Sequence, residues 1–394
     1  MRVLISFIGT GRKAANEGKQ EYETAIYGLP DGSQRESSLI TSVLYHHLKP
    51  DKLIVIGTAK SIWSELDKLV GEDLDKIPIY NKIFEETWGG SVSEETLKEW
   101  EEFLREKLGV EISLNLVPED ATEEIVAVLN RELPQGAKEV YLDITHAFRH
   151  FPLLAAFTLP VLKYIKGFEN LTLIYGKLNK KPKVSPIIFL NLPDRLIKLL
   201  EAVSLTEHAS NFELFGDILE NSKIKELYLK VETNRRVGQS YINNLQKELQ
   251  QKNYPSVVEE IGEEYLEGKV LEDLKAPSLP LRMAKRAVFF AERKQFLKAF
   301  TLVYEALINT QPPEGEECNE NLYRERRNRL DQTLQGEDRK LFHTIRGLRN
   351  AMAHGCRPKN GELQRLLEDE RELIELVKKG ALLVEKLENQ KGKS

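Results

Sequence analysis

The sequence predicts an α/β domain with a parallel-rich sheet, followed by an all-helical region. Two observations carry this prediction: short apolar runs alternate with amphipathic stretches up to about residue 193, and beyond that point only helical periodicities remain. Apolar runs that alternate with helices are typical of parallel, doubly wound sheets. Because 394 residues are more than one hydrophobic core usually accommodates, two or three domains are expected.

Six buried strands are predicted in the first half. Their apolar runs are Val3–Ile8, Lys52–Ile56, Glu111–Val117, Glu139–Asp143, Leu171–Tyr175 and Ile187–Leu190. A helix is predicted over Ala121–Leu133, and an alternating strand over Glu21–Gly28, with the next helix starting near Ser37. Ligands of parallel sheets bind beyond the carboxyl ends of the strands, so the loops that follow these strands are the expected site.

The second half is predicted to be helical. Leu281–Ile308 and Leu363–Leu387 have the apolar periodicity of long helices. A further amphipathic helix is centred on Ile345, with Gly355 as its C-terminal cap. The predicted organisation is an α/β domain over 1–195, a helical connector over 196–280 and a helical domain over 281–394.

The composition is typical of a soluble globular protein. The chain has 57 basic and 62 acidic residues and a net charge of -5, so any RNA contact must be local rather than driven by an overall positive field. Cys318 and Cys356 are far apart and lack partners at metal-binding spacing, which fits a reducing cytosol. Because the first residues form a strand and no apolar run could cross a bilayer, a cytoplasmic protein is expected.

A glycine-rich loop follows the first predicted strand. Gly9-Thr10-Gly11 opens a match to the Gly-x-Gly-x-x-Ala form of the dinucleotide-binding fingerprint. That fingerprint requires a helix directly after the glycines, whereas this chain continues into a predicted strand, which argues against a nicotinamide cofactor. Two interpretations stay open: the loop offers backbone N–H groups to a phosphate, or the glycines only permit a tight turn.

A second polar loop follows the strand that ends at Asp143. Thr145, His146 and Arg149 supply a hydroxyl, an imidazole and a guanidinium, a set that suits an anionic ligand carrying a base. His146 and His150 are four residues apart and could bind zinc together with Asp143, but no further ligand is evident and the arginine would repel a cation. No metal site is therefore expected, and His150 is interpreted as a helix-packing residue.

An arginine and a histidine mark the end of the helix centred on Ile345. At roughly 100° per residue, Arg349 and His354 point in different directions, so they would meet most easily if two copies of this helix end faced each other in a dimer. A guanidinium can hold a phosphodiester, and an imidazole can move a proton near neutral pH. The alternative is structural: Arg349 pairs with an acidic neighbour and His354 interacts with the helix dipole.

The order Arg-Asn-x-x-x-His at a helix end resembles the active-site motif of HEPN-domain ribonucleases. The segments Ile5–Gly11 and Asp143–Arg149 look like the CARF domain of type III CRISPR-associated ancillary proteins. Together, these features make the chain similar to the CARF–HEPN ribonucleases over both halves. The resemblance implies a Rossmann-like CARF sensor over 1–195, which dimerises and binds a cyclic oligoadenylate, and a HEPN ribonuclease domain over 281–394.

The resemblance also assigns individual residues. Those that it places at the messenger are Gly9, Thr10, Gly11, Arg12, Gly57, Thr58, Thr145, His146 and Arg149. It places Arg349 and His354 of each protomer in a composite nuclease site, with Asn350 orienting them. This chain departs from the family pattern at Arg12 and Lys13, where two positive charges follow the glycines. Slow cleavage of the messenger, assisted by Thr10 or Thr145, would be a secondary activity.

The predicted function is a cyclic oligoadenylate-activated, metal-independent endoribonuclease of type III CRISPR antiviral defence. Arg349 would stabilise the charge of the transition state and His354 would act as general acid or base while a 2′-hydroxyl attacks its own phosphodiester. The expected partners are cyclic tetra-adenylate as activator, single-stranded RNA as substrate and further copies of the chain in a homodimer or higher even oligomer, with no other cofactor and no membrane. The alternative function is a ligand-responsive regulator that binds nucleic acid without cutting it.

Overall fold

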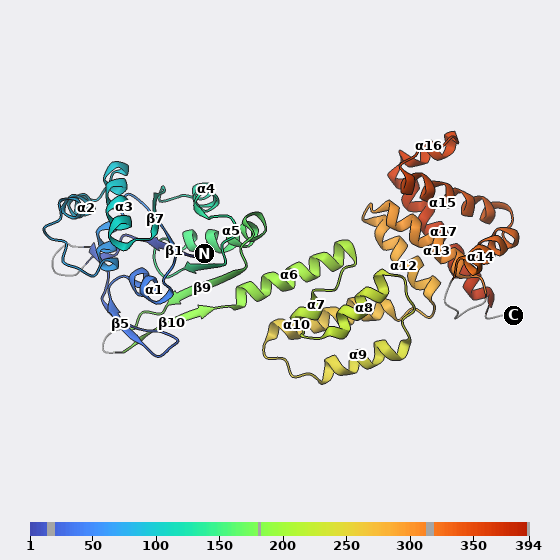
Figure 1. Ribbon diagram of the computed structural model, residues 1–394, viewed down its shortest axis with the longest axis horizontal. Coiled ribbons are helices and arrows are strands. Elements are labelled where there is room, and N and C mark those ends of the chain that lie inside the picture. The colour runs from blue at the N-terminus through green and yellow to red at the C-terminus, as the bar shows by residue number, and fades with distance from the viewer. Residues whose placement is uncertain (14–19, 180–182, 313–318, 392–394) are drawn as a thin grey trace. The chain divides into compact units, whose positions relative to one another are not determined.

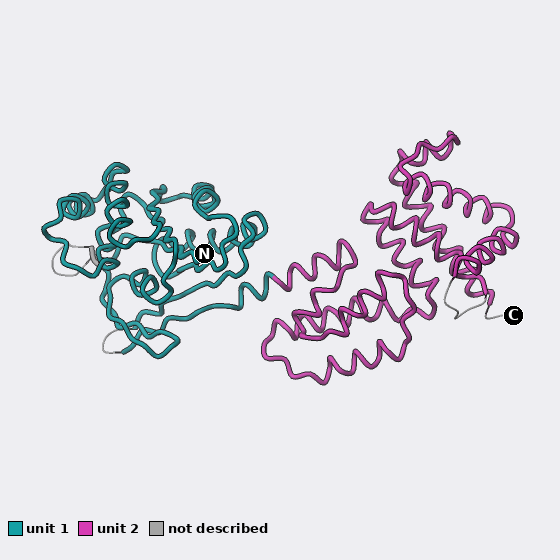
Figure 2. Tube along the Cα trace, in the orientation of Figure 1, with its two compact units in different colours: residues 1–197 teal, residues 198–394 magenta. Residues whose placement is uncertain are grey.

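The computed structural model describes residues 1–13, 20–179, 183–312 and 319–391 (Figure 1). The chain forms two compact units, Met1–Ile197 and Lys198–Ser394 (Figure 2). The first unit is built on an eight-stranded sheet, and the described residues of the second unit form helices without strands. The predicted change from α/β to all-helical structure near residue 193 is confirmed.

The large sheet has the strand order β5-β4-β10-β9-β8-β1-β6-β7, and β2 pairs separately with β3. The strands are β1 Arg2–Ile8, β2 Arg12–Lys13, β3 Gln20–Glu21, β4 Ala25–Gly28, β5 Gln34–Ser37, β6 Lys52–Gly57, β7 Glu111–Leu116, β8 Glu139–Asp143, β9 Asn170–Gly176 and β10 Ser185–Leu190. The strands β7, β6, β1, β8 and β9 are parallel neighbours. β10 is antiparallel to β9 and parallel to β4, and β4 and β5 form an antiparallel hairpin.

Helices cover both faces of the parallel strands (Figure 1). The helices of this unit are α1 Ile40–Leu48, the 3-10 helix η1 Trp63–Leu69, α2 Pro78–Gly89, α3 Glu94–Leu108, α4 Glu123–Glu132, α5 His150–Lys166 and the first residues of α6 Leu192–Ala209. In β1, Leu4 packs in the core beneath α1 and α3, whereas Ile5 packs in the core beneath α4 and α5. Since both faces are buried, β1 is apolar at nearly every position rather than at alternate ones.

The parallel strands follow the Rossmann-like order, with a switch point at β1. Among these five parallel strands, the chain first adds β6 and β7 on one side of β1, and then β8 and β9 on the other side. At such a point the loops after the two central strands diverge and leave a crevice at their carboxyl ends. The glycine loop follows β1 and the Thr145–Arg149 segment follows β8, so both predicted loops flank this crevice.

One predicted strand and one predicted helix start differ from the structure. The strand Glu21–Gly28 is wrong as a single element, because β3 ends at Glu21 and β4 begins only at Ala25. Between them, Tyr22 turns inward, where its hydroxyl bonds to Gly9. The helix expected near Ser37 begins at Ile40, after the β5 strand of the hairpin.

The second unit contains two hydrophobic cores. Its helices are the remainder of α6, α7 Phe215–Ile218, α8 Ser222–Glu232, α9 Gln239–Gln251, α10 Val257–Tyr265, the π-helix η2 Leu266–Leu271, α11 Glu272–Leu274, α12 Leu279–Glu292, α13 Phe296–Asn309, α14 Glu320–Thr333, α15 Gly336–His354, α16 Gly361–Leu367 and α17 Glu370–Lys391. Helices α6 to α11 share one core, and α12 to α17 share the other. In the second core, α12, α13, α15 and α17 pack closely on one another.

Both long helices predicted in this unit are broken. Leu281–Ile308 is split between α12 and α13, because Lys294 adopts a left-handed φ of 58° and its N–H bonds back to Ala291. Leu363–Leu387 is split between α16 and α17, because the Asp369 carboxylate accepts the N–H groups of the first turn of α17. Each break lets the chain turn and pack the next helix back on the same core.

Candidate functional site

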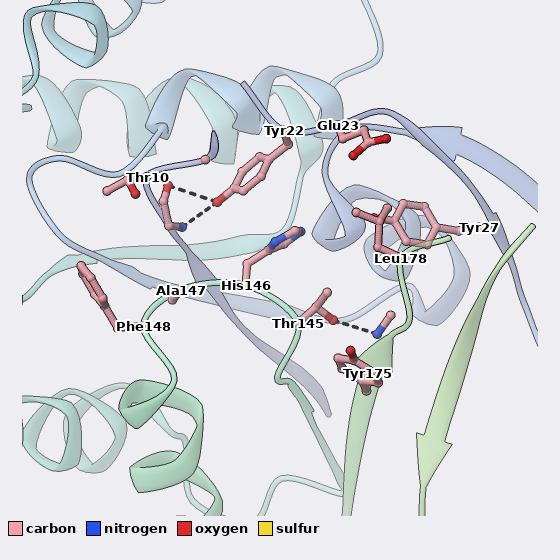
Figure 3. A pocket seen from close by; sticks show the side chains of 13 residues that line it. Thr10, Tyr22, Glu23, Tyr27, Thr145, His146, Ala147, Phe148, Tyr175 and Leu178 are labelled. Atoms are coloured by element: carbon pink, nitrogen blue, oxygen red, sulfur yellow. Dashed lines mark hydrogen bonds between the residues drawn. The ribbon is translucent and has the colours of Figure 1, made fainter. Parts of the chain in front are cut away.

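A cavity of about 610 Å³ opens at the carboxyl ends of β1 and β8 (Figure 3). Its lining residues are Gly9, Thr10, Gly11, Tyr22, Glu23, Tyr27, Thr145, His146, Ala147, Phe148, Tyr175, Gly176 and Leu178. They come from the loop after β1, the segment from β3 through β4, the loop after β8, and the end of β9 with the residues that follow it. The cavity therefore lies at the switch point of the sheet, where a ligand is expected from topology.

Tyr22 holds the glycine loop in place. Its hydroxyl accepts a hydrogen bond from the Gly9 N–H at 2.6 Å and donates one to the Gly9 carbonyl at 3.1 Å (Figure 3). Burial raises the pKa of Tyr22, so the phenol remains protonated and keeps both bonds at neutral pH. Because the Gly9 N–H is already bonded, it becomes available to a phosphate only when Tyr22 moves away.

The two loops of the cavity approach each other at Gly9. A Cβ at this position would lie 3.1 Å from both the N and the Cα of Ala147. These are backbone atoms that cannot easily move aside, so the close approach favours glycine at position 9. Ala147 itself has a φ of 81°, a left-handed conformation that is rare for alanine. Such strain persists only where the surroundings enforce it, and it is frequent at binding sites.

A buried polar network positions Thr145. The fully buried Asp143 carboxylate accepts a hydrogen bond from Ser6 Oγ at 2.8 Å and another from the Thr145 N–H at 2.9 Å. Thr145 Oγ1 in turn accepts the Gly176 N–H at 2.9 Å (Figure 3). A hydroxyl that accepts from a backbone N–H keeps its own hydrogen, so Thr145 can still donate to a ligand.

His146 presents a neutral ring to the cavity. Its ring centroid lies 4.4 Å from that of Tyr22, with an angle of 34° between the planes. Burial lowers the pKa of His146, and the charge of Asp143 opposes this only in part, so the imidazole is uncharged at neutral pH. The buried Nε2 of His146 has no hydrogen-bond partner within the described part of the chain. An uncharged, unpaired ring nitrogen suits a hydrogen bond to a base better than an ion pair with a phosphate.

Four of the residues assigned to the messenger by resemblance are not found on this cavity. Thr58 is buried, and its N–H bonds to Ser61 Oγ at 2.9 Å. Gly57 lies against the β1 strand, where an added Cβ would come within 2.5 Å of Ile8 Cγ2. Arg149 directly precedes α5 with an exposed side chain, and Arg12 lies in β2, where the structure does not describe the side chains.

Several residues that line the cavity were not predicted from the sequence. Tyr22 and Glu23 lie between the short strands β3 and β4, and Tyr175 and Leu178 lie at and beyond the end of β9. In the sequence, these positions belong to predicted strands and their ends, and no polar motif distinguishes them. The one available signal was topological, because every segment that reaches the switch point contributes to the crevice.

The helix that carries the arginine–histidine motif forms as predicted. Ile345 and Leu348 are fully buried on its inner face, and Gly355 ends it with a left-handed φ of 62°. The Arg349 side chain is 30% exposed, and His354, the last residue of α15, is exposed. Within the described ranges, no hydrogen bond or ion pair joins these two side chains. Arg349 does have an acidic neighbour, so the structural interpretation of the motif also stays open.

An apolar stripe is exposed along α5. Leu153, Phe157, Val161 and Ile165 follow one another at four-residue intervals, and each is 57–72% exposed. This spacing puts all four on one side of the helix. Soluble monomers seldom expose so many large apolar side chains side by side, and such stripes mark interaction surfaces. The stripe begins just after the Ala147–Phe148 segment of the cavity wall.

No group of three or more His, Cys, Asp or Glu side chains that could hold a metal ion occurs in residues 1–13, 20–179, 183–312 and 319–391. Over the same ranges, every helix is too short or too polar to cross a membrane. The Asp143 carboxylate, considered above as a zinc ligand, is instead bonded to Ser6 and Thr145.

Residues 3–182 match a CARF domain. The matching family is described as CRISPR system endoribonuclease Csx1, CARF domain. A curated relative, CRISPR-associated protein MJ1674 of Methanocaldococcus jannaschii, is 30% identical over 276 residues. That match covers 63% of this chain and 43% of the relative, so the chain spans less than half the length of the curated relative. The first match is to a CARF domain within the first unit, and the second is to a CRISPR-associated protein.

A third comparison is with solved structures. Enterococcus italicus Csm6 bound to cyclic hexa-2′-fluoro-hexa-dAMP has a TM-score of 0.37 and 13% sequence identity to this chain. The alignment covers 98% of this chain and 94% of that one.

Proposed function

We propose that the chain is a cyclic oligoadenylate-activated, metal-independent endoribonuclease that cuts single-stranded RNA in type III CRISPR defence. The observation that carries this proposal is the cavity at the switch point of the sheet, within the residues that match a CARF domain. The first unit would bind the messenger, and the second unit would cut RNA. Cyclic tetra-adenylate is the proposed activator.

The chemistry of the cavity supports a ligand that carries bases. Tyr22 and His146 offer aromatic faces on which an adenine can stack, and the unpaired Nε2 of His146 can bond to a base edge. The Thr145 hydroxyl can donate to a phosphate oxygen. Among the described lining residues no lysine or arginine occurs, so the proposed sources of positive charge are Arg12 and Arg149, which follow the lining residues Gly11 and Phe148 in the chain.

Two copies of the chain would pack through the α5 stripe. Burial of exposed apolar side chains stabilises an interface by roughly 25 cal/mol per Å² removed from water, before the cost of association. A twofold interface uses the same patch on both subunits, which suits one continuous stripe. Because the cavity wall leads directly into α5, such a dimer would also bring two cavities to one ring-shaped messenger.

The nuclease step follows from the two side chains at the end of α15. Arg349 of each protomer would hold the scissile phosphate and stabilise the additional negative charge of the phosphorane. His354 would accept the 2′-hydroxyl proton or protonate the leaving 5′-oxygen, while Asn350 orients Arg349. The 2′-oxygen forms the new bond to phosphorus as the bond to the 5′-oxygen breaks. The products are a 2′,3′-cyclic phosphate and a 5′-hydroxyl.

The experiment is RNA cleavage by the full-length chain with cyclic tetra-adenylate present. Arg349→Ala and His354→Ala are expected to abolish cleavage while messenger binding, measured by calorimetry, is unchanged. Arg365→Ala is the matched control, because it removes an exposed arginine that pairs with Glu372 elsewhere in the same unit. Full cleavage by either of the first two variants would remove this assignment.

A second candidate function is a messenger-responsive regulator that binds nucleic acid without cutting it. The contact of Arg349 with an acidic side chain and the placement of His354 at a helix end favour this candidate, because both fit purely structural roles. RNA binding without cleavage by the wild-type chain, in the presence of cyclic tri-, tetra- and hexa-adenylate, would support it over the nuclease.

A further inference from the structure

Arg349 lies in a cradle of three side chains. Its guanidinium carbon is 5.4 Å from the centre of the Tyr304 ring, its Nη2 is 3.8 Å from Glu305 Oε1, and its Nη1 donates to Asn350 Oδ1 at 3.0 Å. Tyr304 and Glu305 belong to α13, whereas Arg349 and Asn350 belong to α15. The position of the guanidinium is therefore set by two helices rather than by its own helix alone.

The α13 side of this cradle is itself fixed. Tyr323 of α14 donates its hydroxyl to Glu305 Oε1 at 2.9 Å. Burial raises the pKa of Tyr323, and the negative charge of Glu305 raises it further, so the phenol keeps its proton and the bond. Tyr304 is almost fully buried and stacks on Phe342, with ring centroids 5.6 Å apart and planes 12° apart. Glu305 is thus held whether or not Arg349 contacts it.

An arginine side chain that is already held in position binds a phosphate at a lower entropic cost than a mobile arginine side chain. A long, exposed side chain samples many rotamers, and aligning it costs conformational entropy. At 3.8 Å the Glu305 contact is an ion pair and not a hydrogen bond, so it limits the position of the guanidinium without occupying its N–H donors. Apart from the Nη1 hydrogen that bonds to Asn350, the N–H donors of Arg349 then remain available for the oxygens of a phosphodiester.

We infer that Glu305 is the positioning residue for Arg349: together with Tyr304 it holds the guanidinium ready for the scissile phosphate, and Tyr323 anchors it. Glu305 would not touch RNA. This inference rests on the proposed function, because a positioning role has meaning only if Arg349 acts on RNA.

The test is Glu305→Gln in the full-length chain. Glutamine retains an oxygen that accepts from Tyr323 but has no charge to restrain Arg349. With cyclic tetra-adenylate saturating, kcat for RNA cleavage is expected to fall by roughly tenfold, while KM for RNA stays within about twofold, because alignment and not binding is lost. Glu305→Asp keeps the charge and is expected to recover part of the lost kcat.

The matched control is Glu372→Gln. It removes the carboxylate that pairs with Arg365 through two contacts of 2.7 and 2.8 Å, away from Arg349, so kcat is expected to be unchanged. A second readout does not depend on activity: the Nε–H resonance of Arg349, assigned by its loss in Arg349→Lys, should report greater mobility in Glu305→Gln and not in Glu372→Gln.

Two outcomes separate this inference from the proposed function. If Glu305→Gln leaves kcat and Arg349 mobility unchanged while Arg349→Ala is inactive, the positioning role is overturned and the nuclease stands. If Arg349→Ala cleaves RNA as fast as the wild-type chain, the nuclease assignment itself fails, and the positioning role fails with it.

Discussion

Tyr22→Phe tests how the glycine loop at the cavity is held. The substitution removes one hydroxyl, and with it the hydrogen bonds of 2.6 and 3.1 Å to the N–H and carbonyl of Gly9. A single protein hydrogen bond contributes about 1 kcal/mol net, and a buried group left without any partner costs about 1–3 kcal/mol. Because Gly9 is buried but borders a cavity that water can enter, the expected loss in the free energy of unfolding is about 2 kcal/mol.

The assay is thermal unfolding of the full-length chain, followed by calorimetry. For a unit of this size, about 2 kcal/mol corresponds to a fall of roughly 4–8 °C in the Tm of the transition assigned to the first unit. Cyclic tetra-adenylate should recover part of this loss, since a ligand that binds only the folded state stabilises it. Tyr175→Phe, which removes a more exposed phenol at the same cavity, is the control. A Tm unchanged by Tyr22→Phe would refute the claim that this hydroxyl holds the loop.

Three further predictions concern the cavity and the α5 stripe. Burial lowers the pKa of His146, so on acidification the unfolded chain binds a proton at this residue before the folded chain does, and the free energy of unfolding should fall as pH drops from about 7 to 5. The variant His146→Gln should make the free energy of unfolding depend less on pH. An unchanged pH dependence in this variant would contradict the reasoning. If the proposed dimer forms through the α5 stripe, Phe157→Asp should be a monomer by light scattering, whereas Phe84→Asp on α2 should remain a dimer; a dimeric Phe157→Asp would place the interface elsewhere. Thr145→Ala should raise the concentration of cyclic tetra-adenylate that half-activates RNA cleavage by roughly tenfold, since a donor to the phosphate is lost, and an unshifted activation curve would exclude this hydroxyl from the binding site.

The elements that could be predicted are those in which local pattern and burial agree. β1 and β6 are buried on both faces and therefore appear in the sequence as nearly continuous apolar runs, whereas β8 shows only the short apolar centre Val140–Leu142. The helix α15 shows its inner stripe at Ile345 and Leu348 and its cap at Gly355 without reference to any other part of the chain. These are local signals, and they place both predicted loops and the arginine–histidine motif on the correct elements.

The remaining features depend on contacts between distant residues. Lys294 follows α12 in a left-handed conformation, a position that glycine usually occupies at the end of a helix. Because a lysine stands there instead, the sequence gives no sign of the break before α13. At the start of α17 the Asp369 carboxylate accepts the N–H groups of Arg371 and Glu372, a break that the apolar periodicity of Leu363–Leu387 does not reveal. Tyr22 reaches the cavity only because its hydroxyl meets Gly9, thirteen residues earlier in the chain. Glu305 and Arg349 are likewise brought together only by helix packing.

The central claim is that a nucleotide bound at the strand ends of the first unit activates RNA cleavage by the second. The most direct measurement is the rate of single-stranded RNA cleavage by the purified chain, with EDTA present, as cyclic tri-, tetra- or hexa-adenylate is titrated. The account predicts that cyclic tetra-adenylate raises the rate and that the products carry 2′,3′-cyclic phosphates. A rate that no messenger changes, from a chain that binds one of them tightly, would contradict it.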